Sequence, residues 1–78
     1  MSKRIYVGNL PFSCAKPDLF ALFSKYGKVV SVDIRTDKTP DGPKAFGYVE
    51  MDAGAEKAIE ALNRSPFGDK SLEVREAR

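Results

Sequence analysis

Two aromatic side chains in this sequence are spaced so that they could stack against a flat partner. Phe46 and Tyr48 lie two residues apart in a run that ends at Met51. Because successive side chains of a strand point to opposite faces, both rings would share one face, with Gly47 and Val49 on the other. Rings separated in this way from their aliphatic neighbours are either covered by another segment or available to a ligand.

The remaining side chains offer little catalytic chemistry. The sequence contains no histidine, the commonest general base and metal ligand. Its single cysteine, Cys14, excludes an internal disulfide and a multi-cysteine metal site, and we expect an inert thiol there. We therefore predict no enzymatic activity and no cofactor.

Length and composition predict one small intracellular domain. The chain has 78 residues, 42% of them hydrophobic and 31% charged, so we expect one folded domain over residues 1–78. The net charge of +2 permits a nucleic-acid surface without demanding one. No apolar run resembles a signal peptide or a membrane span, and a single cysteine fits a reducing compartment. We expect a cytoplasmic monomer, with the nucleus and organelles as open alternatives.

The first third of the chain predicts a strand and then an amphipathic helix. Residues 4–8 form the strand, with Ile5 and Val7 on one face and Tyr6 on the other. The helix start is weakly capped, because Ala15 stands where serine or threonine is usual. The apolar stripe of this helix is formed by Leu19, Leu22, Phe23 and Tyr26.

The middle of the chain predicts two further strands. Residues 29–35 form the first of them, with Val30, Val32 and Ile34 facing inward. Residues 36–43 are rich in proline, aspartate and glycine, which predicts a loop or hairpin leading into the aromatic strand.

The last third predicts a helix, a turn and a final strand. Asp52 is the predicted helix cap, and residues 63–70 form a turn region with a small hairpin around Phe67. Leu72 and Val74 mark the final strand. The apolar stripe of this second helix consists of Ala55, Ala58, Ile59 and Leu62.

This order predicts an α+β fold, the ferredoxin-like βαββαβ sandwich, in which a four-stranded antiparallel sheet carries both helices on one face. The first and third strands would lie together in the centre of the sheet. The helices would cover the aliphatic face, which leaves Tyr6, Phe46 and Tyr48 on the open one. Three rings on an uncovered face indicate a binding surface.

Two runs of the sequence carry a family signature: Lys44-Ala45-Phe46-Gly47-Tyr48-Val49-Glu50-Met51 and Ile5-Tyr6-Val7-Gly8-Asn9-Leu10. The first resembles the octapeptide of the RNA recognition motif family, and the second resembles its hexapeptide. Ala45, where the octapeptide has glycine, and Met51, where it has an aromatic residue, depart from the pattern without changing the open face. Similar runs elsewhere are Asn9-Leu10-Pro11-Phe12, Leu22-Phe23-Ser24-Lys25-Tyr26-Gly27 and Ala58-Ile59-Glu60-Ala61-Leu62-Asn63.

The resemblance implies a single-stranded RNA-binding module, similar to small single-motif RNA-binding proteins, that acts in post-transcriptional regulation. It implies that Tyr6 and Phe46 each stack under a base, and that Tyr48 packs against sugars or lies between two nucleotides. Lys44 would contact a phosphate. Further candidate contacts to base edges or phosphates are Asn9, Arg35, Arg75 and Arg78.

Acidic residues on the same face argue for weak binding. Asp33, Glu50 and Glu73 would also point to the open side and repel phosphates. With only two or three bases stacked against the cost of ordering a flexible strand, we expect affinity on the order of micromolar or weaker. Single-stranded DNA stays open as a ligand.

Two other functions compete with RNA binding. The same fold could bind a protein partner through its helices, where Phe20 lies off the apolar stripe. It could also be an acylphosphatase-like enzyme, but that resemblance calls for an arginine near a phosphate-binding loop after the first strand. The loop here, residues 9–13, has no arginine and contains Pro11.

Overall fold

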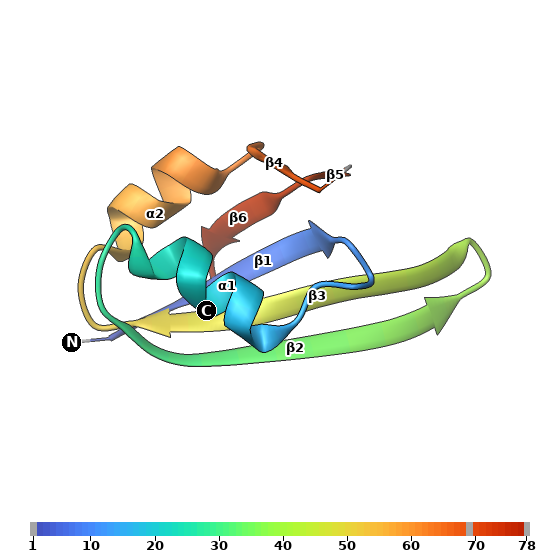
Figure 1. Ribbon diagram of the computed structural model, residues 1–78, viewed down its shortest axis with the longest axis horizontal. Helices are drawn as coiled ribbons and strands as arrows, with labels where there is room; N and C mark the ends of the chain where they lie inside the picture. The colour runs from blue at the N-terminus through green and yellow to red at the C-terminus, as the bar shows by residue number, and fades with distance from the viewer. Residues whose placement is uncertain (1, 69, 78) are drawn as a thin grey trace.

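The computed structural model describes residues 2–68 and 70–77, which form a twisted sheet with two helices on one face (Figure 1). The elements are β1 Lys3–Leu10, α1 Lys16–Ser24, β2 Val29–Thr39, β3 Gly42–Met51, α2 Ala55–Leu62, β4 Pro66–Phe67, β5 Lys70–Ser71 and β6 Glu73–Glu76. The order of the antiparallel sheet is β2-β3-β1-β6, and β4 and β5 form a separate small hairpin. The predicted ferredoxin-like fold is confirmed, with the first and third strands in the centre.

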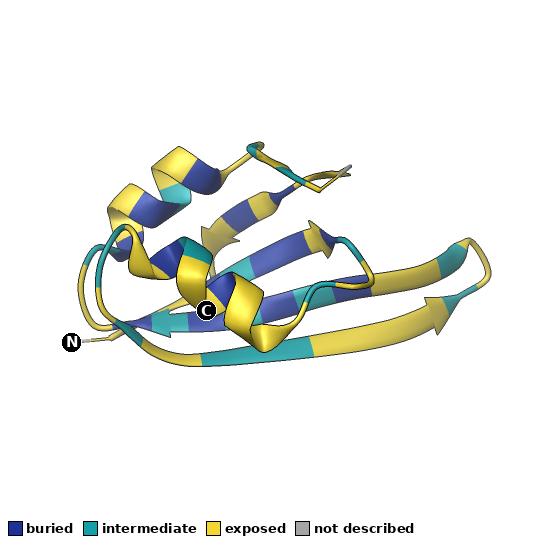
Figure 2. Ribbon diagram, in the orientation of Figure 1, coloured by how far each residue is buried: buried dark blue, intermediate teal, exposed yellow. Residues whose placement is uncertain are grey.

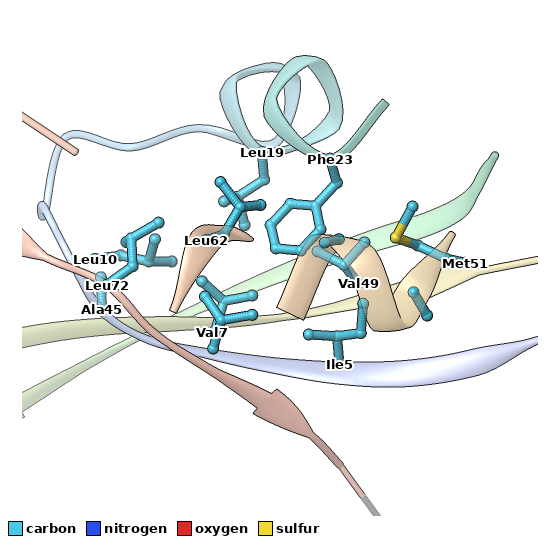
Figure 3. Close-up of a cluster of buried hydrophobic side chains, with 13 residues drawn as sticks. Ile5, Val7, Leu10, Leu19, Phe23, Ala45, Val49, Met51, Leu62 and Leu72 are labelled. Atoms are coloured by element: carbon cyan, nitrogen blue, oxygen red, sulfur yellow. The ribbon is translucent and has the colours of Figure 1, made fainter. Parts of the chain in front are cut away.

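The hydrophobic core lies between the sheet and the helices (Figure 3). Helix α1 packs over β2 and β3, and α2 packs over β1 and β6. Leu19 and Phe23 enter the core from α1 and Leu62 from α2, as their helical spacing predicts. Four strand residues on this face have 0% exposure: Ile5, Val7, Val49 and Met51.

Helix α1 begins as predicted, with one compensation for its weak cap. Ala15 is the N-cap and has no side chain that could accept a hydrogen bond. Instead the carboxylate of Asp18 accepts a hydrogen bond from the Ala15 backbone N–H at 2.9 Å. Tyr26 lies beyond the last helical residue, Ser24, yet still packs against the core. Within the described ranges, no helix is long and apolar enough to span a bilayer.

The prediction that Asp52 caps α2 is wrong, because the N-cap is Gly54. Gly54 has φ of 82°, and a Cβ atom there would lie 2.0 Å from the carbonyl oxygen of Tyr26. The segments that follow α1 and precede α2 therefore touch through their backbones. The Asp52 N–H donates to the Lys28 carbonyl at 2.9 Å, which places Asp52 in this crossing rather than at the helix start.

The predicted inward position of Val30 is also wrong, since its side chain is 52% exposed. The register passes from Val29 opposite Met51 to Ser31 opposite Glu50, so Val30 is the extra residue of a bulge. Val29 takes the inward position instead, and Val32 and Ile34 pack against the core as predicted.

Strands β2 and β3 extend further than the sequence suggests. They pair continuously to Thr39 opposite Gly42, so most of the predicted connection 36–43 is itself a hairpin. The Thr39 hydroxyl donates to the Gly42 carbonyl at 2.6 Å across the turn. The tip of this hairpin projects past the helices and is largely exposed (Figures 1 and 2).

Candidate nucleic-acid interface

The face of the sheet opposite the helices carries the predicted aromatic residues. Strand register pairs Tyr6 with Tyr48, Arg35 with Phe46, and Arg75 with Tyr6. Directly paired residues of antiparallel strands project to the same face. The four strands thus bring the three rings and two of the predicted arginines to one surface.

The three rings touch one another and form a continuous patch, here called the aromatic platform (Tyr6, Phe46 and Tyr48). The ring centroids of Tyr6 and Phe46 are 6.2 Å apart, with 30° between their planes. Tyr48 meets Tyr6 at 5.8 Å and Phe46 at 6.1 Å, both edge to face. Such geometries are attractive between aromatic rings. The platform is therefore preorganised, and each ring remains half-buried rather than fully exposed.

Gly8 gives the ring of Tyr6 its position. A Cβ atom at Gly8 would lie 2.7 Å from the Tyr6 hydroxyl oxygen and 2.8 Å from a ring carbon. The hydroxyl end of the ring therefore lies over the backbone of β1 at Gly8, where only glycine leaves room. This close approach of a side chain explains the glycine within the hexapeptide.

Two guanidinium groups lie against the platform. Arg75 is 4.9 Å from the centroid of Tyr6, and Arg4 is 4.8 Å from that of Tyr48. Both are within cation–π distance. Arg75 was predicted at this surface and Arg4 was missed, although Arg4 stands two residues before Tyr6 and alternation alone places it on the same face.

The other predicted contacts have different surroundings. Arg35 is on the platform face, but its guanidinium pairs with the Asp33 carboxylate at 3.3 Å. Asn9 has φ of 60°, and its side-chain amide N–H donates to the Ser71 carbonyl of β5 at 2.7 Å. One of its hydrogen-bond donors is therefore already used within the protein. Lys44 is exposed opposite Asp37 on β2. Arg78 lies outside the described residues.

The predicted acidic residues also lie on the platform face. Asp33 is opposite Tyr48, and Glu73 is opposite Gly8. Glu50 accepts a hydrogen bond from the Ser2 hydroxyl at 2.6 Å. The surface thus has cations close to its rings and carboxylates around them, which moderates its attraction for phosphate.

Cys14 has the properties of an inert thiol. Its side chain is partly buried in the segment before α1, and it packs against the core. Burial raises the pKa of the Cys14 thiol, and the nearby Asp18 carboxylate raises it further. A raised pKa keeps the group protonated and poorly nucleophilic at neutral pH.

Comparison with known proteins assigns the family. The pattern of the RNA recognition motif matches residues 5–73. The chain belongs to the RNA recognition motif family. Members of this family are binding modules rather than enzymes, in agreement with the prediction from the residue types. The resemblance seen in the two signature runs is confirmed.

Several relatives support this assignment. RbpA of Synechocystis sp. is 41% identical over 76 residues, which cover 95% of this chain and 75% of RbpA. RbpE of Nostoc sp. is also 41% identical, over 95% of this chain and 77% of RbpE. Both names describe RNA-binding proteins.

Solved structures share the fold over nearly the whole chain. RNA binding protein PG1 is 40% identical with a TM-score of 0.84, covering 96% of this chain and 93% of PG1. The Sxl-lethal protein in complex with RNA is 35% identical with a TM-score of 0.81, covering 96% of this chain and 47% of that one.

Proposed function

We propose that this RNA recognition motif binds single-stranded RNA on the aromatic platform and acts in post-transcriptional regulation. The observation that carries the proposal is that three mutually packed rings occupy the face that no helix covers. The names of its relatives and the RNA complex of its structural neighbour support it. Because the rings are already held in place, a nucleic acid can stack without reorganising the sheet.

In this proposal Tyr6 and Phe46 each stack under one base, and Tyr48 packs against a sugar or between two nucleotides. Stacking on an aromatic side chain is worth about 1–3 kcal/mol per base. Arg4 and Arg75, which cover parts of the ring faces in the free protein, become available to phosphates or to the outer faces of the bases. Lys44 adds a phosphate contact at the edge of the platform.

The carboxylates and the small net charge limit the affinity. The net charge is +2, and Arg35 is already paired with Asp33. Exposed ion pairs of this kind contribute little to stability, so a phosphate could replace Asp33 at low cost. We expect a dissociation constant on the order of micromolar or weaker, with two or three stacked bases offsetting the entropy of the ordered strand.

The proposal is tested by titrating the protein with short single-stranded RNA and DNA oligomers while its amide NMR signals are followed. We expect the largest shifts at the platform residues and at Arg4 and Arg75. Shifts confined to the helices, or no shifts with any oligomer, would overturn the proposal. Weaker shifts with DNA of the same sequence would show that 2′-hydroxyl contacts contribute to the choice of RNA.

A second candidate function is protein binding through α1. Phe20 on this helix is 51% exposed, and Phe12 just before it is 52% exposed. Large exposed aromatic side chains are enriched at protein interfaces. A Phe20→Ser variant separates the two functions, because it should leave RNA titrations unchanged. Loss of RNA binding in this variant, with the fold intact, would show that α1 is part of the RNA surface.

A further inference from the structure

A hollow of about 380 Å³ lies at one end of the aromatic platform, beside Tyr6 and Phe46. This volume is within the roughly 300–1,000 Å³ typical of ligand sites. Its walls come from the end of β1, the β2–β3 turn with the start of β3, β5, and the start of β6. The polar side chains around it are Tyr6, Asn9, Asp41, Lys44, Lys70 and Glu73.

The hollow exists because β1 is irregular at this point. The register passes from Val7 opposite Gly47 to Leu10 opposite Ala45, so the two residues between them on β1 face one residue on β3. A bulge of this kind bends the strand and opens the ladder locally. Asn9 sits in the bulge with φ of 60°, and its amide holds the Ser71 carbonyl at 2.7 Å. That hydrogen bond fixes β5, and hence Lys70, at the edge of the hollow.

The charged groups around the hollow have no partners of their own within residues 2–68 and 70–77. The side chains of Lys44, Lys70 and Glu73 make no hydrogen bond or ion pair in that part of the chain. Glu73 is opposite Gly8, and the hydroxyl end of Tyr6 lies over the same glycine. The carboxylate and the Tyr6 hydroxyl therefore border one space, next to the ring proposed to carry a base.

We propose that this hollow is a subsite for guanine, whose Watson–Crick edge is read by the Glu73 carboxylate, with the adjoining phosphate on Lys44 and Lys70. The inference rests on the proposed binding of RNA and adds a base preference to it. It assigns Glu73, which would otherwise only repel the phosphate backbone, a direct role in recognition.

The chemistry of the bases favours guanine at a carboxylate. An ionised carboxylate can only accept hydrogen bonds, and guanine presents two adjacent donors, N1–H and the N2 amino group. Two parallel bonds to one carboxylate form a bidentate, charge-assisted pair. Adenine and cytosine offer one amino group on this edge. Uracil offers one N–H between two carbonyl oxygens, which a carboxylate repels.

The experiment uses uridine hexamers that carry a single guanosine, adenosine or cytidine at each position in turn. Affinities are measured by fluorescence anisotropy at fixed salt. We expect one position at which guanosine binds about tenfold more tightly than uridine, the discrimination usual for a bidentate contact. Adenosine and cytidine should fall between the two. The absence of a guanosine preference at every position would overturn the inference.

Glu73→Gln tests the assigned residue, and Glu50→Gln is the matched control on the same face. Each variant removes one negative charge, so each should bind the hexamers without guanosine somewhat more tightly. Only Glu73→Gln should also lose the guanosine preference, reducing the guanosine-to-uridine ratio to near one. An unchanged ratio in Glu73→Gln, or equal loss in both variants, would overturn the role of Glu73.

The lysines are tested separately through salt dependence. Lys70→Gln should weaken binding of every hexamer alike and reduce the slope of log affinity against log salt by about one, while the guanosine preference stays. An unchanged slope would show that Lys70 does not contact a phosphate. Failure of the wild-type protein to bind any hexamer would instead contradict the proposed RNA binding, so the two failures are distinguishable.

Discussion

The two faces of the sheet use the same strands for different purposes. On β1, Ile5 and Val7 are fully buried under the helices, whereas Tyr6 between them is half-exposed on the other side. The buried face is aliphatic, and it is stabilised by the removal of apolar surface from water. The open face keeps its rings in mutual contact but uncovered by helices. Substitutions on the first face should therefore change stability, and those on the second should change binding.

The largest expected effect comes from the buried face. Phe23→Ala removes a fully buried ring from the core and should lower the free energy of unfolding by about 3–5 kcal/mol. For a chain of 78 residues this is much of the total stability. Urea denaturation followed by circular dichroism measures the change. A loss below about 1 kcal/mol would show that the core is not packed as described.

The corresponding change on the open face is the pair Phe46→Ala and Tyr48→Ala. Losing two stacking rings at about 1–3 kcal/mol each should reduce a micromolar RNA affinity to undetectable levels. The rings also pack on each other, so we expect a modest stability cost of about 1–2 kcal/mol. Calorimetric titration measures the RNA affinity and thermal melting measures the stability, both on the same sample. A collapsed fold, or unchanged RNA affinity, would contradict the division between the faces.

Two glycines allow a finer test of the difference between the two faces of the sheet, because each lies beneath a side chain on a different face. A Cβ atom at Gly8 would lie 2.7 Å from the Tyr6 hydroxyl oxygen, and one at Gly47 would lie 2.8 Å from the Asp33 carbonyl oxygen and 3.1 Å from Leu19. Gly8→Ala should displace a platform ring and weaken RNA binding several-fold with little loss of stability. Gly47→Ala should lower the melting temperature instead, because backbone and core must move. Similar effects of both variants on stability would argue against this assignment.

The smallest expected effect concerns an exposed ion pair at the margin of the helix-covered face. The Lys3 ammonium is 2.6 Å from the Glu56 carboxylate and ties β1 to α2. The hydrogen bond from Lys3, followed by its charge, holds the pKa of Glu56 below its ordinary value. The contribution to stability is therefore present above that ordinary value and is lost as the pH falls through the lowered pKa.

The contribution of this ion pair to stability is measured by comparing the unfolding free energies of the wild type and Glu56→Gln across acidic pH. The difference in unfolding free energy should be small near neutral pH, because both side chains are exposed, and should vanish at low pH. A difference that grows on acidification would mean that the carboxylate is destabilising in the folded state.

Most of the fold could be predicted because alternation and helical spacing are local properties. Tyr6, Phe46 and Tyr48 were placed on one face by a period of two, and Leu19 and Phe23 in the core by a period near four. These patterns depend only on residues that are close together in the sequence, so they can be recognised without knowledge of the contacts between distant segments.

The errors fall where the backbone departs from regular geometry. A bulge turns Val30 outward, and the backbone crossing near Tyr26 places Gly54 rather than Asp52 at the start of α2. Both features depend on pairing between distant segments. The partner of Arg35 and the engagement of Asn9 with Ser71 were likewise invisible in the sequence, because they are set by the three-dimensional arrangement.

The central claim is that RNA bases lie on the aromatic platform. Its most direct test is the measurement of intermolecular nuclear Overhauser effects in the complex with a short RNA. We predict contacts from the ring protons of Tyr6, Phe46 and Tyr48 to base and ribose protons. Contacts from Phe20 or other α1 residues, without any from these three rings, would contradict the account.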